Sequence, residues 1–85
     1  MYTGELLPYP RIFPPFGIFR VLTRDGKNVE DEYEDPIRSL ADEDVDNNPI
    51  LKYELQPGDR VTFDIEDKGE DMGKIAINIK PLKND

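Results

Sequence analysis

The chain has 85 residues, with no cysteine and no histidine, and a formal net charge of −8 at pH 7. This length accommodates one domain, residues 1–85, with a small core, and the missing residue types exclude disulfides, thiol nucleophiles, cysteine-ligated metals and histidine-based acid–base chemistry. No apolar run approaches the roughly 18 residues of a membrane span and no signal peptide is visible, so we expect a cytoplasmic protein with no membrane partner.

A short strand followed by a proline-rich loop opens the chain. Tyr2–Leu7 fits an edge strand. The prolines at positions 8, 10, 14 and 15 argue against a central strand beyond it, because proline cannot donate to a ladder. Tyr9 and Phe13 stand among these prolines, and the simplest interpretation is that the loop's aromatic side chains cover one end of the core.

The next predicted strand spans residues 16–22, and the Asp25-Gly26 turn signal closes it. Side chains alternate along a strand. Phe16, Ile18, Arg20 and Leu22 therefore point to one side, and Gly17, Phe19 and Val21 point to the other. Both sides carry apolar residues, so neither is plainly the solvent face.

The middle of the chain is acidic. Residues 28–48 hold nine carboxylates and a single basic residue, Arg38, so most of the negative excess lies here. Asp35-Pro36 is typical of a helix start, with aspartate as the cap and proline at the first position. It predicts one or two helical turns over residues 36–41.

An acidic loop is expected over residues 42–48. Its Asp42-x-Asp44-x-Asp46 spacing begins like a calcium-binding loop. The glycine and the final glutamate that such a loop needs are absent from the positions where they belong. We therefore expect a solvated loop, with no metal and no cofactor.

The last part of the chain predicts an antiparallel hairpin with one face in a core. Residues 61–66 and 75–80 each alternate between apolar and polar side chains, with β-branched and aromatic residues on one side. The polar segment between them carries Gly69 and Gly73, which is typical of a hairpin loop longer than two residues.

Several short motifs occur along the chain in a recognisable order. They are Thr3-Gly4, Phe16-Gly17-Ile18-Phe19, Asp25-Gly26 and the final-strand residues Ala76, Asn78 and Ile79. Their order and spacing resemble the bacterial cold-shock domain, most closely in the C-terminal hairpin. The family's second RNA-binding motif has only Val29 and Tyr33 as similar residues here.

Together, the alternation and the resemblance predict an all-β fold. We expect a small five-stranded antiparallel barrel of the OB or cold-shock type, with a proline-rich N-terminal loop and an acidic middle loop. An SH3-like barrel is the alternative. The expected core consists of Leu6, Phe19, Val21, Val61, Phe63, Ile65, Ile75, Ile77 and Ile79.

The resemblance implies a non-catalytic module that binds single-stranded RNA or DNA weakly. Phe16 and Ile18 would take the two exposed stacking positions, with Arg20 beside them. Tyr9 and Phe13 add aromatic rings on the preceding loop, and aromatic platforms beside basic groups are what single-strand binders use.

The net charge leaves a second function open, because a protein this acidic repels a polyanion at long range. Tyr33 is flanked by Glu32, Glu34 and Asp35, a pattern suited to a basic protein surface. An acidic interaction or inhibitor module, including one that mimics the charge of DNA, is therefore the alternative. Nothing singles out a pair of carboxylates for acid–base work, so we expect neither an enzyme nor a small-molecule substrate.

Overall fold

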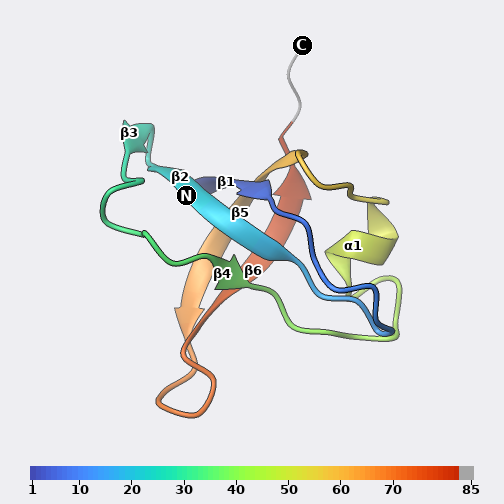
Figure 1. Cartoon of the computed structure of the whole chain (residues 1–85). Helices are drawn as coiled ribbons and strands as arrows, with labels where there is room; N and C mark the ends of the chain where they lie inside the picture. The colour runs from blue at the N-terminus through green and yellow to red at the C-terminus, as the bar shows by residue number, and fades with distance from the viewer. Residues whose placement is uncertain (83–85) are drawn as a thin grey trace.

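Seven short elements make up the fold (Figure 1), and the computed structural model describes them within residues 1–82. The strands are β1 (Tyr2–Leu6), β2 (Ile18–Arg24), β3 (Lys27–Asn28), β4 (Ile37–Arg38), β5 (Arg60–Asp67) and β6 (Lys74–Pro81), with one helix, α1 (Pro49–Lys52), between β4 and β5. No helix in residues 1–82 is long and apolar enough to cross a membrane.

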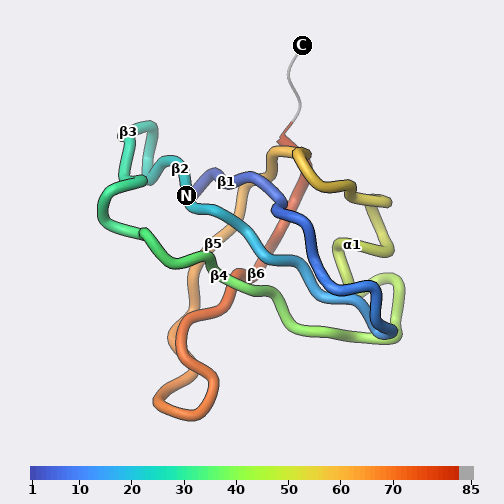
Figure 2. The backbone as a smooth tube through the Cα atoms, viewed as in Figure 1, coloured from blue at the N-terminus to red at the C-terminus, as the bar shows by residue number. Residues whose placement is uncertain are grey.

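Five of the strands close into a barrel. Their order is β1-β5-β6-β4-β2, and β1 closes the ring by pairing with β2, while β3 only extends β2 (Figure 2). The all-β, OB-like barrel predicted from the sequence is confirmed. One pair differs from the antiparallel expectation, because β4 runs parallel to β6, and this parallel pair excludes the all-antiparallel SH3-like alternative.

Closure of the barrel depends on a glycine in β1. Gly4 pairs with Val21 of β2 and with Val61 of β5, so β1 is paired on both sides and is not the edge strand predicted from the sequence. A Cβ atom on Gly4 would lie 2.6 Å from the carbonyl oxygen of Arg20 and 2.7 Å from the ring of Phe63. Only glycine lets the three strands approach this closely.

The interior is filled largely as predicted. Phe19 and Phe63 meet at its centre, with ring centroids 5.9 Å apart. Of the predicted core, Leu6, Phe19, Val21, Val61, Phe63 and Ile79 are buried in the central cluster, and Ile75 is buried outside it. Ile65 is half-buried against this core.

The prediction for Ile77 was wrong, and a bulge in β6 explains why. The register with β5 shifts between Thr62 and Asp64, and Asn78 adopts a left-handed φ of 52° at this point. An extra residue reverses the alternation beyond it. Ile77 is therefore only half-buried, and Ala76 joins the core in its place.

The helical turns predicted over residues 36–41 were also wrong. Ile37 and Arg38 form β4 instead, paired with β2 on one side and with β6 on the other. The helix begins later, at Pro49, where Asn48 caps it by accepting a hydrogen bond from the Ile50 backbone at 3.0 Å.

Candidate nucleic-acid interface

The outer face of β2 and β4 gathers part of the predicted site. Phe19 pairs with Ile37 and both point into the core, so their neighbours Ile18 and Arg38, which also pair, lie on the outer face. Arg20 lies two residues along β2 on the same face. Both arginines are exposed and Ile18 is half-buried.

This face continues beyond the two strands. The Ser39 backbone donates to the Gly17 carbonyl oxygen at 2.9 Å, and the Ser39 hydroxyl accepts from the Gly17 backbone at 2.7 Å. Extending the same register places Phe16, which is half-buried, beside Leu40, which is 44% exposed. We call Phe16, Ile18, Arg20, Arg38 and Leu40 the β2–β4 face.

The two arginines of this face form no ion pair among the described residues, although Arg20 lies opposite an acid. Within residues 1–82, no carboxylate lies within ion-pair distance of the guanidinium of Arg20 or Arg38. Glu5 is the nearest acid by register, because it pairs with Arg20 across β1 and β2. The face therefore offers two cationic groups around an apolar strip.

The aromatic residues of the N-terminal loop have different roles. Tyr9 packs against the core, and its hydroxyl donates to the Leu55 carbonyl oxygen at 3.5 Å. Phe13 is 71% exposed. The loop that carries both residues runs beside residues 42–48, because the Asn48 side chain donates to the Pro15 carbonyl oxygen at 2.8 Å (Figure 1).

Sequence reasoning missed Arg38 and Leu40. Both residues fell inside the predicted helical turns, where their side chains would not have shared a face with Ile18. The sequence contains no signal for them, because Ile37-Arg38-Ser39-Leu40 does not alternate between apolar and polar residues; only the structure shows that Ile37 and Ser39 are buried while Arg38 and Leu40 are exposed.

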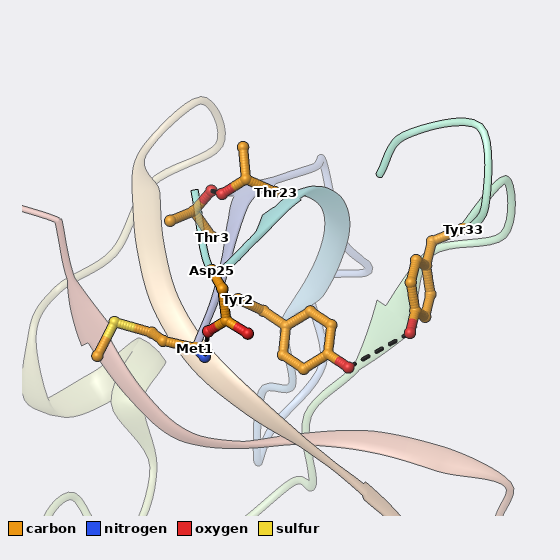
Figure 3. A network of polar contacts seen from close by, with 6 residues as sticks. All are labelled: Met1, Tyr2, Thr3, Thr23, Asp25 and Tyr33. Atoms are coloured by element: carbon orange, nitrogen blue, oxygen red, sulfur yellow. Dashed lines mark hydrogen bonds and ion pairs between the residues drawn. The ribbon is translucent and has the colours of Figure 1, made fainter. Parts of the chain in front are cut away.

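The acidic segment, residues 30–35, lies at another part of the barrel and is held by Tyr33. The Tyr33 hydroxyl shares a hydrogen bond of 3.3 Å with the hydroxyl of Tyr2, and the two rings meet edge-on (Figure 3). Tyr33 is half-buried against the core, whereas Glu32, Glu34 and Asp35 are exposed.

A hollow follows this segment. It is lined by residues 31–37 together with Lys74, whose ammonium nitrogen lies 5.9 Å from the centre of the Tyr33 ring. Arg24 also reaches the segment, with its guanidinium 3.6 Å from the Glu32 carboxylate. The hollow is thus a carboxylate-rich surface with an aromatic wall.

Three groups near the start of the chain have displaced pKa values. The hydrogen bond from Tyr33, and then burial, raise the pKa of Tyr2. The Glu32 carboxylate raises the pKa of Arg24. The hydrogen bond and charge of the Met1 ammonium, 2.7 Å away, lower the pKa of Asp25 (Figure 3). Each shift favours the form of the group that is already present at neutral pH.

Metal ligation finds no support from side-chain clustering. Residues 1–82 contain no group of three or more potential ligands placed to hold an ion. In the acidic loop, the Asp42 carboxylate accepts from the Asp44 backbone at 2.8 Å, and Asp44 does the same for Asp46 at 3.0 Å. These carboxylates therefore cap turns of their own loop.

No protein-family model, curated protein or solved structure matches this chain. The fold assignment accordingly rests on the strand order and pairing, and the cold-shock resemblance stays a prediction.

Proposed function

We propose that this protein is a non-catalytic module that binds short single-stranded RNA or DNA weakly on its β2–β4 face. The observation that carries the proposal is the pairing of Ile18 with Arg38, which places two unpaired arginines around an apolar strip. OB barrels bind oligonucleotides on the face of their second and third strands. In this barrel those strands are β2 and β4.

Each group on the face has a definite part in this proposal. Arg20 and Arg38 contact phosphates, since phosphate contacts supply most of the affinity of such proteins. Phe16 stacks on a base, which contributes about 1–3 kcal/mol. Ile18 and Leu40 pack against a neighbouring base without offering a π-face, so the expected affinity is low.

The N-terminal loop contributes one further aromatic ring. Phe13 is exposed and free to stack on a base next to the face. Tyr9 is held against the core, so in this proposal it positions the loop and does not contact the ligand.

The first prediction concerns titration with short single-stranded DNA and RNA, followed by residue-resolved NMR at low salt. We expect the β2–β4 face and Phe13 to shift, with a Kd of about tens of micromolar or weaker, because the net negative charge opposes binding. Arg38→Glu should weaken binding by roughly tenfold or more, since it replaces an attraction by a repulsion.

Lys27→Glu provides the matched control for this prediction. It makes the same change of charge on an exposed residue of the β2–β3 hairpin, away from Ile18 and Arg38. Its effect on affinity should be several-fold smaller. Equal effects of the two substitutions, or no shifts at millimolar oligonucleotide, would remove the proposed site.

A specific observation favours a second candidate, in which the acidic segment docks a basic protein. The hollow along residues 31–37 presents Glu32, Glu34 and Asp35 beside the ring of Tyr33. Tyr2 holds that ring in place, so a lysine or arginine of a partner would meet an ordered surface. Charge complementarity between such surfaces raises the rate of association at low salt.

Charge reversal tests this second candidate. The variant Glu32→Lys/Glu34→Lys/Asp35→Lys should lose basic partners in a pull-down at low salt. The control Glu43→Lys/Asp44→Lys/Asp46→Lys changes net charge equally in the other acidic loop and should keep those partners. Identical partner sets for the first variant and the unchanged protein would exclude the candidate.

A further inference from the structure

One edge of β6 is almost unpaired. Its other edge pairs with β5 from Lys74 to Pro81, but β4 reaches it only at Ile75, the partner of Arg38. Beyond Arg38 the chain turns to β2, where the Ser39 backbone donates to Gly17. From Ala76 onward, no strand within residues 1–82 pairs with this edge.

A groove runs along this free edge. It has a volume of about 370 Å³, and the five consecutive residues Ala76–Lys80 line it. Successive side chains of a strand point to opposite faces. On either side of the Asn78 bulge, one buried residue (Ala76 or Ile79) and one more exposed residue (Ile77 or Lys80) line the groove, so it lies beside the edge of β6 and not over one of its faces.

The opposite wall supplies apolar and cationic groups. It is formed by Ser39 and Leu40 after β4, by Asp46 and Asn47 of the acidic loop, and by Pro49, Lys52 and Tyr53 at α1. Leu40, Ile77 and Tyr53 are all partly exposed. The groove thus combines a strand edge with an apolar lining.

The charges of the groove differ from those of the rest of the chain. Lys52 and Lys80 line it, against Asp46 as its one acid. The local excess is one positive charge, which favours an acidic ligand at short range, while salt screens the negative charge of the more distant parts of the chain.

We propose that this groove binds an extended peptide with alternating acidic and apolar side chains, which adds to the free edge of β6 as a further strand. Main-chain hydrogen bonds supply the affinity in such strand addition, and alternate side chains supply the selectivity. Apolar side chains of the peptide contact Leu40, Ile77 and Tyr53, and acidic ones contact Lys52 and Lys80. This site is additional to the β2–β4 face and shares only Leu40 with it.

The test uses capped seven-residue peptides in which glutamate alternates with valine, leucine or phenylalanine. At low salt at least one should shift the amides of Ala76–Lys80, with a Kd on the order of 100 µM because the buried area is small. Replacing glutamate by lysine should weaken binding at least fivefold. If no peptide binds at 1 mM, or the lysine peptides bind as well, the proposal is wrong.

Backbone methylation distinguishes strand addition from side-chain docking. Every second backbone N–H of an added strand points toward β6, so the peptide nitrogens form two alternating sets. Methylation of the set that faces β6 should abolish binding, and methylation of the other set should not. Equal binding of both methylated sets would overturn the strand arrangement.

Variants separate this site from the oligonucleotide face. Lys80→Glu should weaken the peptide at least fivefold and leave oligonucleotide binding unchanged within about twofold, since Lys80 lies outside the β2–β4 face. Lys27→Glu changes the charge equally and should affect the peptide little. If Lys80→Glu and Lys27→Glu act alike on the peptide, the groove is not its site.

Discussion

Asn48 joins the acidic loop before it and the helix after it to the proline-rich loop, which is 33 residues away in the sequence. It is fully buried, and its amide nitrogen donates to the carbonyl oxygens of Pro15 at 2.8 Å and of Asp42 at 2.9 Å. Its amide oxygen accepts from the Ile50 backbone at 3.0 Å and caps α1. One side chain thereby fixes the proline-rich loop, the acidic loop and the helix to one another.

Replacing Asn48 therefore has a large expected cost. Asn48→Ala should lower the free energy of unfolding by about 2–4 kcal/mol, since it removes a helix cap and leaves the buried carbonyl of Pro15 and the partly buried carbonyl of Asp42 without this donor. The neighbouring Asn47→Ala, on an exposed side chain, should change it by less than about 0.5 kcal/mol. Urea unfolding measures both, and similar midpoints would contradict the joining role of Asn48.

The elements of the barrel were predictable where local pattern and tertiary pairing agree. The alternation over residues 61–66 identified β5, and that over residues 16–22 identified β2 within two residues of its bounds. The pattern also placed Phe16, Ile18 and Arg20 on one face. In β6 the period-two pattern failed at the Asn78 bulge, because alternation along the sequence does not reveal where a strand contains an extra residue.

The sequence predicted helical turns where β4 forms and did not predict α1, and the reason for both errors is non-local. Asp35-Pro36 and Asn48-Pro49 are equally good helix starts by local chemistry. Only the second is a helix, because Asn48 finds partners 33 residues away in the chain. The segment after Asp35 instead pairs with β2 and β6, and a local sequence pattern contains no information about pairing with strands that are distant in the sequence. Because residues 36–41 were predicted to be helical, Arg38 and Leu40 were left out of the predicted site.

At the scale of the whole molecule, we expect repulsion between carboxylates to outweigh the ion pairs. The part of the chain that the structure describes contains three ion pairs, and all of them are exposed. Exposed pairs contribute about 0–1 kcal/mol each. The net charge of −8 is confined to a barrel with a radius of gyration of 12.2 Å. This distance is close to the Debye length of roughly 10 Å at 0.1 M salt, so salt screens much of the repulsion.

The resulting prediction is that stability and oligonucleotide binding respond to salt in opposite directions. At pH 7, raising NaCl from about 20 to about 300 mM should increase the urea midpoint, because screening relieves self-repulsion in the compact state. The same change should weaken oligonucleotide binding by loss of counterion release. Near pH 4.4, the sequence pI, the net charge approaches zero and the salt dependence of the midpoint should largely vanish. A midpoint that falls with salt at pH 7 would show that attractive pairs, and not repulsion, dominate the electrostatics of the fold.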